Sequence, residues 1–280
     1  MQARVPGQRM SSKELSMQHE RPGPEFWSLI HPFTGNRTSV GRTERGFEAD
    51  LTAVVECEKG PFFVKAMRNR QGGRRSSILR ERAIASTVRP IAPALVWEAE
   101  NDDWIVLGYE VVSGRRADFT TGSPDLSVVA ELINHLRTLP APDVARTWAE
   151  NRWDRFTEPE AARLFRGGTL LHADIHPSNV MVGDGRSWLV DWSWPTLGVA
   201  FIDPACMVVQ LISTGHTPAQ AETWAGQCEG WAKADPAALD AFARATYRMW
   251  VTRAEGRPDE SWLGAMVTAA QEWTRHRGLT

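Results

Sequence analysis

The spacing of apolar residues changes once along this 280-residue chain, near Ser113-Gly114. Before that point, short apolar runs with a period of two are separated by turn residues, a pattern typical of β-strands. After it, apolar residues recur three and four positions apart, a pattern typical of amphipathic helices. The sequence therefore predicts an α+β fold in which a small sheet is followed by a mainly helical region.

The region before Ser113 predicts five strands, with one helix after the third. Strands are expected at residues 38–40, 51–57, 61–67, 94–97 and 104–110, and the helix at 78–88, with Ser76-Ser77 as its N-cap. Later helices are expected at 125–139, at 158–165 and over most of the chain beyond Asp203-Pro204. We assign residues 1–25 to a flexible tail, 26–112 to one domain and 113–280 to another.

The amino-acid composition limits the kinds of binding partner and the cellular location that we expect for this chain. A net charge of -2 and a pI near 6.4 give no basic surface for nucleic acid or for an anionic membrane. No apolar run approaches the length of a transmembrane helix, and the residues up to Pro24 lack the apolar core of a signal peptide. The three cysteines are far apart and lack metal-ligand spacing. These features favour a cytoplasmic protein that binds neither nucleic acid nor membrane, and they leave its oligomeric state open.

The residues most suited to chemistry lie in and before a predicted β-hairpin. Two short apolar runs joined by a turn predict this antiparallel hairpin over residues 179–191. Val182 lies opposite Ser187 in one register and opposite Trp188 in the other. The register decides which side chains meet at the open end of the hairpin.

An amide and two carboxylates come together if the second register is correct. Asn179 then lies directly opposite Asp191, with Cβ atoms about 5 Å apart. Their oxygen atoms suit Mg²⁺, which keeps further positions for phosphate oxygens and water. Asp174 lies on the loop before the hairpin, where it can accept the proton of an attacking hydroxyl. The residues therefore predict a phosphoryl-transfer site, and the alternative is a buried His–Asp hydrogen bond beside an ordinary turn.

The same stretch resembles a known family of enzymes. Residues 172–179 read His-Ala-Asp-Ile-His-Pro-Ser-Asn, and Asp191-Trp192 follow. These residues are similar to the catalytic loop, much like His-Gly-Asp-Leu-His-Pro-Gly-Asn, and to the metal-binding pair of the aminoglycoside phosphotransferase and choline kinase family. The resemblance implies a protein-kinase-like two-lobe fold, with a small antiparallel β-sheet N-lobe that carries one helix and a mainly α-helical C-lobe. It implies Asp174 as the catalytic base, Asn179 and Asp191 as metal ligands, and ATP with Mg²⁺ as cofactors, with GTP left open as the donor.

The nucleotide-binding residues are expected in the N-lobe. Lys65 is the basic residue inside the third strand, and Glu81 is the acid inside the following helix. The resemblance places the phosphate-binding lysine and its partner acid here, where an ion pair would hold the lysine toward the phosphates; the alternative is an edge-strand lysine and a solvated acid. Backbone groups near Glu110 and Val112 are expected to contact adenine, from their position alone. The loop at 41–48 lacks the Gly-x-Gly-x-x-Gly pattern, so the sequence gives little support for phosphate contacts there.

The acceptor is expected to be a small molecule with a hydroxyl group. The segment from Asp191 to Asp203 is short and lacks the Ala-Pro-Glu that usually ends a protein-kinase activation segment. Asp203 is expected to brace the catalytic loop. We favour an antibiotic or a related natural product, with resistance by O-phosphorylation; a metabolic kinase for choline, a sugar or an amino alcohol and a non-catalytic nucleotide-binding module stay open. Tryptophans of the C-terminal helices are candidates for the acceptor cleft, although most are expected to pack between helices: Trp224, Trp231, Trp250, Trp262 and Trp273.

Overall fold

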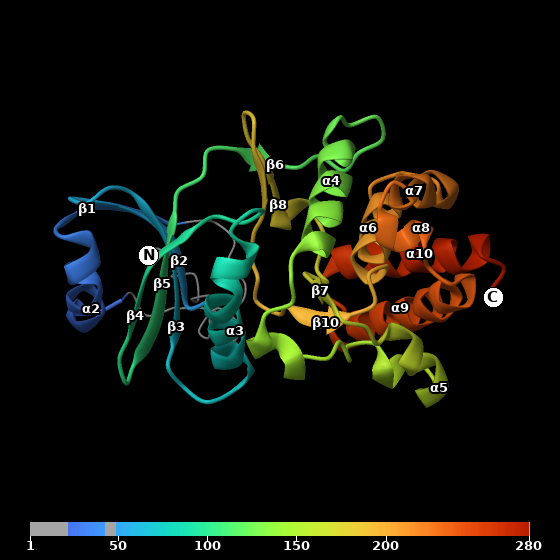
Figure 1. Ribbon diagram of the computed structural model, residues 1–280, viewed down its shortest axis with the longest axis horizontal. Coiled ribbons are helices and arrows are strands. Elements are labelled where there is room, and N and C mark those ends of the chain that lie inside the picture. Colours follow the sequence, from blue (N-terminus) through green and yellow to red (C-terminus); the bar gives the residue numbers. More distant parts are fainter. Residues whose placement is uncertain (1–21, 43–48, 280) are drawn as a thin grey trace, which may run out of the picture. The chain divides into compact units, whose positions relative to one another are not determined.

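The computed structural model describes residues 22–42 and 49–279 (Figure 1). Most of the predicted tail, residues 1–21, lies outside the described residues. Residues 43–48, which make up most of the loop considered for phosphate contacts, lie outside them as well.

The described residues form two compact units. The first contains residues 22–42, 49–76 and 96–111, and the second contains residues 77–95 and 112–279. The first is built on an antiparallel sheet and the second is mainly helical, so the predicted fold class is confirmed. The sequence analysis places all residues from 26 to 112 in one domain. In the structure, residues 77–95 belong to the second unit instead.

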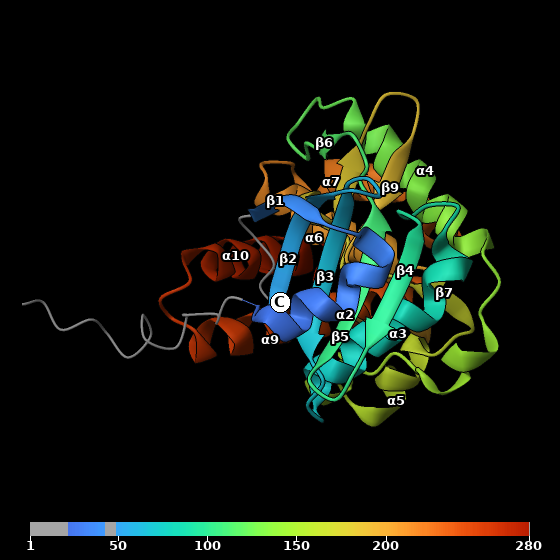
Figure 2. The same ribbon diagram turned by 90° about the vertical axis from the view of Figure 1, so that its left-hand side faces the viewer.

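Five strands form the sheet of the first unit, in the order β1-β2-β3-β5-β4 (Figure 2). Their bounds are β1 Arg37–Arg42, β2 Leu51–Cys57, β3 Phe62–Arg68, β4 Leu95–Glu100 and β5 Trp104–Glu110. The pairs β1–β2, β2–β3 and β3–β5 are antiparallel. Ala53 and Val55 of β2 are buried in the same core as Val64 and Ala66 of β3. This alternation is the reason that the period of two located the strands.

Helix α2 (Pro24–Thr34) covers one face of this sheet, and the sequence pattern did not predict it (Figure 2). Phe26 and Ile30 lie one turn apart and are buried in the core of the sheet. Pro32 interrupts the helical signal in the last turn. Gly35, with a φ of 65°, ends the helix in a conformation that favours glycine.

The second unit holds most of the helices (Figure 1). The helices that lie wholly in it are α4 Asp125–Thr138, α5 Pro159–Ala162, α6 Ile202–Ser213, α7 Pro218–Ala225, α8 Glu229–Ala232, α9 Pro236–Gly256 and α10 Ser261–His276, and α3 Gly73–Val88 lies in it except for its first four residues. One face of α4 is buried throughout, as its periodicity predicts. Phe242 of α9 contacts the rings of Phe165 and Phe201 in the core, with centroids 5.4 and 5.7 Å away. Within the described residues, none of the helices combines the length and the apolar composition that crossing a membrane requires.

Two predicted helices differ from the structure at their ends. Helix α3 begins at Gly73, before the predicted start at Ile78. Ser76 Oγ donates back to the Gly72 carbonyl at 3.2 Å, so Ser76 lies within the helix and the predicted N-cap is wrong. The segment predicted as one helix at 158–165 is α-helical only to Ala162 and ends in a 3₁₀ turn.

Short strands of the second unit carry the segments of greatest chemical interest. A three-stranded sheet has the order β6-β8-β9, and a two-stranded sheet pairs β10 with β7. Their bounds are β6 Arg115–Arg116, β7 Thr169–Leu171, β8 Val180–Val182, β9 Ser187–Leu189 and β10 Thr196–Gly198. Val182 lies opposite Ser187, which is the first of the two predicted registers. The register that sets Asn179 directly opposite Asp191 is therefore wrong, and the Val190 N–H donates to the Asn179 carbonyl at 2.9 Å instead.

Candidate active site

The predicted catalytic loop joins β7 to a 3₁₀ turn at Pro177–Asn179. Asp203, in the first turn of α6, accepts hydrogen bonds from the backbone N–H of His172 at 3.2 Å and of Ala173 at 2.5 Å. Ala173 has a φ of 54°, a conformation that costs a non-glycine residue about 1 kcal/mol. The structure confirms the expectation that Asp203 braces the loop.

A second brace was not apparent from the sequence. Arg152 Nη1 donates to the Ala173 carbonyl at 3.0 Å, so Ala173 is held through both its N–H and its carbonyl. The buried carboxylate of Glu150 accepts from Arg152 Nε at 3.0 Å and from Thr196 Oγ1 at 2.6 Å. Burial opposes the charged form of Glu150, but the charge of Arg152 and the hydrogen bonds from Arg152 and Thr196 together outweigh this effect, and the pKa of Glu150 is lowered. We refer to these two residues as the Glu150–Arg152 brace.

His172 ties the loop to the hairpin. Its Nε2 lies 3.0 Å from the Val190 carbonyl, and its ring packs edge-on against Trp192 with centroids 4.7 Å apart. Burial lowers the pKa of His172. The neutral ring therefore donates to a backbone carbonyl, and the alternative of a buried His–Asp hydrogen bond does not describe this site.

Asp174 projects from the braced loop, and 64% of its side chain is exposed. Displacement of water by the surrounding groups favours its neutral form. His176, with Nε2 3.5 Å from Asp174 Oδ2, His172 and Arg152 favour the charged form more strongly, and the pKa of Asp174 falls to about 2. A carboxylate this weakly basic is ionised at neutral pH. It is suited to orienting a hydroxyl and to receiving its proton late in the reaction.

Two predicted metal ligands follow Asp174 in the chain. Asn179 Nδ2 donates to the backbone oxygen of Asp174 at 3.0 Å and to its Oδ2 at 3.1 Å, so the amide oxygen Oδ1 is the atom that the prediction assigns to the metal. Asp191 has a φ of 62°, and its Oδ1 accepts from Ser193 Oγ at 2.5 Å. An amide oxygen and a carboxylate fit Mg²⁺ with phosphate oxygens better than they fit Zn²⁺. In the described part of the chain, no three His, Cys, Asp or Glu side chains form a metal-binding group. Joint coordination by Asn179 and Asp191 stays a prediction.

Comparison with known proteins agrees with this arrangement of residues. Residues 114–242 match the model of the phosphotransferase enzyme family. The match is to the phosphotransferase domain of this family and covers somewhat less than half of the chain. The matched residues include Asp174, Asn179 and Asp191. The match confirms the predicted family and the predicted enzyme class, a small-molecule phosphotransferase acting on a hydroxyl group.

Solved structures of small-molecule kinases have a similar fold. Choline kinase LicA from Streptococcus pneumoniae is 12% identical, with 90% of this chain and 98% of that chain covered and a TM-score of 0.64. Amicoumacin kinase hAmiN, solved with AMP-PNP and Ca²⁺, is 12% identical, with 95% and 96% covered and a TM-score of 0.57. A microcompartment-associated aminopropanol kinase is 15% identical, with 88% and 94% covered and a TM-score of 0.58. At these identities the likeness shows the fold alone. No curated protein matches the chain by sequence.

The predicted nucleotide-binding residues precede the matched phosphotransferase domain. Lys65 in β3 and Glu81 in α3 are both buried. They belong to different units, so their ion pair stays a prediction. Glu110 ends β5 and Val112 follows it, and both are half-buried. Their contact with adenine also stays a prediction.

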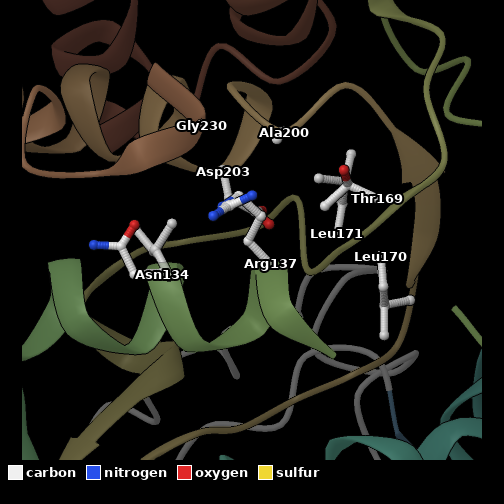
Figure 3. Close-up of a pocket in the computed structure, with 9 residues that line it drawn as sticks. Asn134, Arg137, Thr169, Leu170, Leu171, Ala200, Asp203 and Gly230 are labelled. Atoms are coloured by element: carbon white, nitrogen blue, oxygen red, sulfur yellow. The ribbon is translucent and has the colours of Figure 1, made fainter. Parts of the chain in front are cut away.

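A small cavity in the phosphotransferase domain lies beside the brace from Asp203. Its volume is about 10 Å³, and Asp203 lines it together with Asn134, Arg137 and Gly230 (Figure 3). This space suits about one water molecule. Burial raises the pKa of Asp203 to about 6, against the two N–H groups that favour its charged form. A neighbouring hollow of about 390 Å³ shares Arg137 and Gly230 with this cavity, and none of the predicted site residues lines it.

Proposed function

We propose that the chain is a kinase that transfers the γ-phosphoryl group of ATP to a hydroxyl group of a small molecule, with Mg²⁺ as the metal ion. The observation that carries this proposal is the fixed position of Asp174. The preceding residue is bonded through its N–H and its carbonyl, and Asn179 holds the side chain, yet the carboxylate is exposed. Fixed groups of this kind suit catalysis by positioning. Amicoumacin kinase was solved with AMP-PNP and LicA with AMP, which supports an adenine nucleotide.

Each residue of the loop has a defined role in this proposal. Asp174 orients the acceptor hydroxyl and receives its proton as the oxygen–phosphorus bond forms. Asn179 Oδ1 and the Asp191 carboxylate hold Mg²⁺, which when bound supplies positive charge to the phosphate oxygens. Asp203 and the Glu150–Arg152 brace keep the loop in place and do not touch the reacting atoms.

The nucleotide residues complete the proposal. Lys65, held by Glu81, contacts the α- and β-phosphates, and backbone groups near Glu110 and Val112 contact adenine. A cytoplasmic location remains part of the proposal.

The acceptor that we propose is an antibiotic or a related natural product. Amicoumacin kinase, aminoglycoside phosphotransferase APH(4)-Ia and a macrolide 2'-phosphotransferase are among the similar structures. The second candidate is a metabolic alcohol, supported by the choline and aminopropanol kinases. Both candidates use the same catalytic loop and differ only in the acceptor.

The test is transfer to a panel of hydroxylated antibiotics, amino alcohols, sugars and hydroxy acids in the presence of ATP and Mg²⁺. Mass spectrometry should find one compound that gains a single phosphate. Asp174→Asn should lower the transfer rate by about a hundredfold or more, while Mg–ATP still raises its melting temperature. Asp184→Asn is the matched control, because Asp184 is an exposed carboxylate in the turn of the same hairpin.

Two results would contradict the proposal. Full activity of Asp174→Asn would remove Asp174 from the mechanism. A wild-type protein that neither binds Mg–ATP nor phosphorylates any compound would be a non-catalytic module. Once the substrate is known, cells that express the chain are grown with and without that unmodified compound. Protection from its toxicity indicates an antibiotic kinase, and no protection indicates a metabolic kinase.

A further inference from the structure

Four arginines of the second unit come from two segments that a hydrogen bond joins, and we refer to them as the arginine face: Arg152, Arg155, Arg253 and Arg257. Two of them come from residues 152–156, where a 3₁₀ turn is formed, and two come from the end of α9 and the residue after it. Arg248 Nη1 of α9 donates to the Phe156 carbonyl at 3.1 Å, which joins the two segments. Arg152 bonds to the carbonyl of the residue before Asp174, which brings this face to the catalytic loop.

The charges of the arginine face act on one another and on the catalytic carboxylate. The pKa of Arg253 is lowered, first by burial and then by the other three arginines, while Asp174 acts in the opposite direction. Arg152 contributes in turn to the low pKa of Asp174. The hydrogen bonds of Arg248 and Arg152 place these segments next to each other and next to the catalytic loop.

Little negative charge in the described residues compensates the arginine face. Glu150 forms an ion pair with Arg152, and Glu260 Oε2 lies 3.8 Å from Arg257 Nη1. Within residues 22–42 and 49–279, Arg155 and Arg253 form no ion pair with a carboxylate. An anion placed between these two guanidinium groups would relieve their repulsion.

Aromatic rings border the arginine face. The Arg253 guanidinium lies over the Trp250 ring, 4.9 Å from its centroid, and Trp250 packs edge-on against Trp262 at 6.0 Å. Trp262 is 53% exposed. A flat apolar group of a ligand can pack against this exposed ring while a neighbouring guanidinium binds an anion.

We propose that the acceptor of this kinase is an alcohol that carries a carboxylate or phosphate beside a ring, and that Arg155 and Arg253 bind the anionic group. The inference rests on the proposed function, because it names the acceptor class of that same site. A guanidinium binds a carboxylate or phosphate through two parallel hydrogen bonds, which also fixes the orientation of the acceptor. A polycationic acceptor would meet like charges and is not a substrate.

Three compounds with one ring and one primary alcohol test the charge preference directly. They are 4-(hydroxymethyl)benzoate, its neutral methyl ester and the cationic 4-(hydroxymethyl)benzylamine. Calorimetric titration into the full chain saturated with Mg–AMP-PNP should show the benzoate binding about tenfold or more tightly than the amine. Added salt should reduce this difference. 4-(Hydroxymethyl)phenyl phosphate, titrated in the same way, distinguishes a phosphate site from a carboxylate site.

Variants identify the residues that bind the anion. Arg253→Ala and Arg155→Ala should each reduce the preference for the benzoate, whereas Arg275→Ala should keep it, because Arg275 is an exposed arginine in the last turn of α10. Arg253→Lys should restore part of it, since a lysine keeps the charge but not the paired hydrogen bonds.

Three results would overturn the inference: equal or tighter binding of the amine, no binding of either anionic compound, or an unchanged preference in both alanine variants. Its failure is distinct from failure of the proposed function. A protein that phosphorylates the amine and not the benzoate is still a kinase with another acceptor class. A protein that shows no melting-temperature shift with Mg–ATP alone contradicts the kinase itself.

Discussion

The catalytic loop and the arginine face act on the same carboxylate, but they are held in different ways. Hydrogen bonds fix the loop, since Ala173 is bonded to Asp203 and Arg152, and Asn179 holds Asp174. In the arginine face, Arg253 and Arg155 lie over aromatic rings, at 4.9 and 4.6 Å from the centroids. A loop fixed by hydrogen bonds suits phosphoryl transfer, because this step is the same for every acceptor. Guanidinium groups that pack on aromatic rings can change their orientation to bind a particular acceptor.

Removing the Glu150–Arg152 brace should have the largest effect and tests whether the loop depends on it. Arg152→Ala releases the Ala173 carbonyl, and loss of position at this distance from the reacting atoms should lower kcat about a hundredfold. Arg152→Lys keeps the charge but cannot bond both Glu150 and Ala173, so kcat should fall about tenfold. The KM for ATP should stay unchanged. The acidic limb of the kcat profile should move to higher pH, because Arg152 helps to lower the pKa of Asp174.

The matched control for this experiment is Arg146→Ala, which removes an exposed arginine whose ion pair with Asp143 spans 2.7 Å at the surface. Circular dichroism and the melting temperature establish that each variant folds. A fall in kcat that only follows the folded fraction, with no change in the pH profile, would make the brace a purely structural pair.

The catalytic loop could be predicted because its signals are local. Asp174 and Asn179 stand within eight consecutive residues, and the turn of the hairpin follows directly. Its register could not be predicted, because the turn allows two pairings. The structure has Gly185 with a φ of 78°, and the Gly183 N–H donates to the Arg186 carbonyl at 3.0 Å. This closes the hairpin with Val182 opposite Ser187.

The braces and the arginine face could be predicted only in part. Asp203 stands before Pro204 at the predicted start of a helix, and this suggested its role. Glu150 and Arg152 lie in an irregular segment before the loop, and their partners Ala173 and Thr196 come from other segments of the chain. No period or spacing links such residues, since only the tertiary fold brings them together. For the same reason, no sequence pattern connects the arginines of α9 with the loop.

Asp203 makes a prediction of intermediate size about the pH dependence of stability. Burial raises its pKa in the folded protein to about 6, from 3.8 for the free group. The folded state therefore binds the proton more tightly, and the stability gained from protonation is complete below pH 3.8 and lost as the pH rises through 6. Two pKa units correspond to about 3 kcal/mol.

Urea unfolding between pH 4 and pH 7 measures this effect against Asp203→Asn, which cannot ionise. The free energy of unfolding of the wild type, relative to the variant, should fall by about 2 kcal/mol over this range. Asp184→Asn, which removes an exposed carboxylate, should show a constant difference. If the wild type and Asp203→Asn differ by the same free energy of unfolding at every pH, the Asp203 carboxylate is not buried in solution. The contrast between the hydrogen-bonded catalytic loop and the arginine face would then lose support.

The smallest effect concerns Ala173, whose φ of 54° places it in the left-handed region. Glycine adopts this conformation without strain, so Ala173→Gly should raise the free energy of unfolding by about 1 kcal/mol. The change leaves the N–H and carbonyl that Asp203 and Arg152 bind, and kcat should stay within about twofold. Ala265→Gly, at an exposed position inside α10, should instead destabilise by about 1 kcal/mol. Equal losses at both positions would show that the braces impose no strain on Ala173, whereas opposite signs would show that they do.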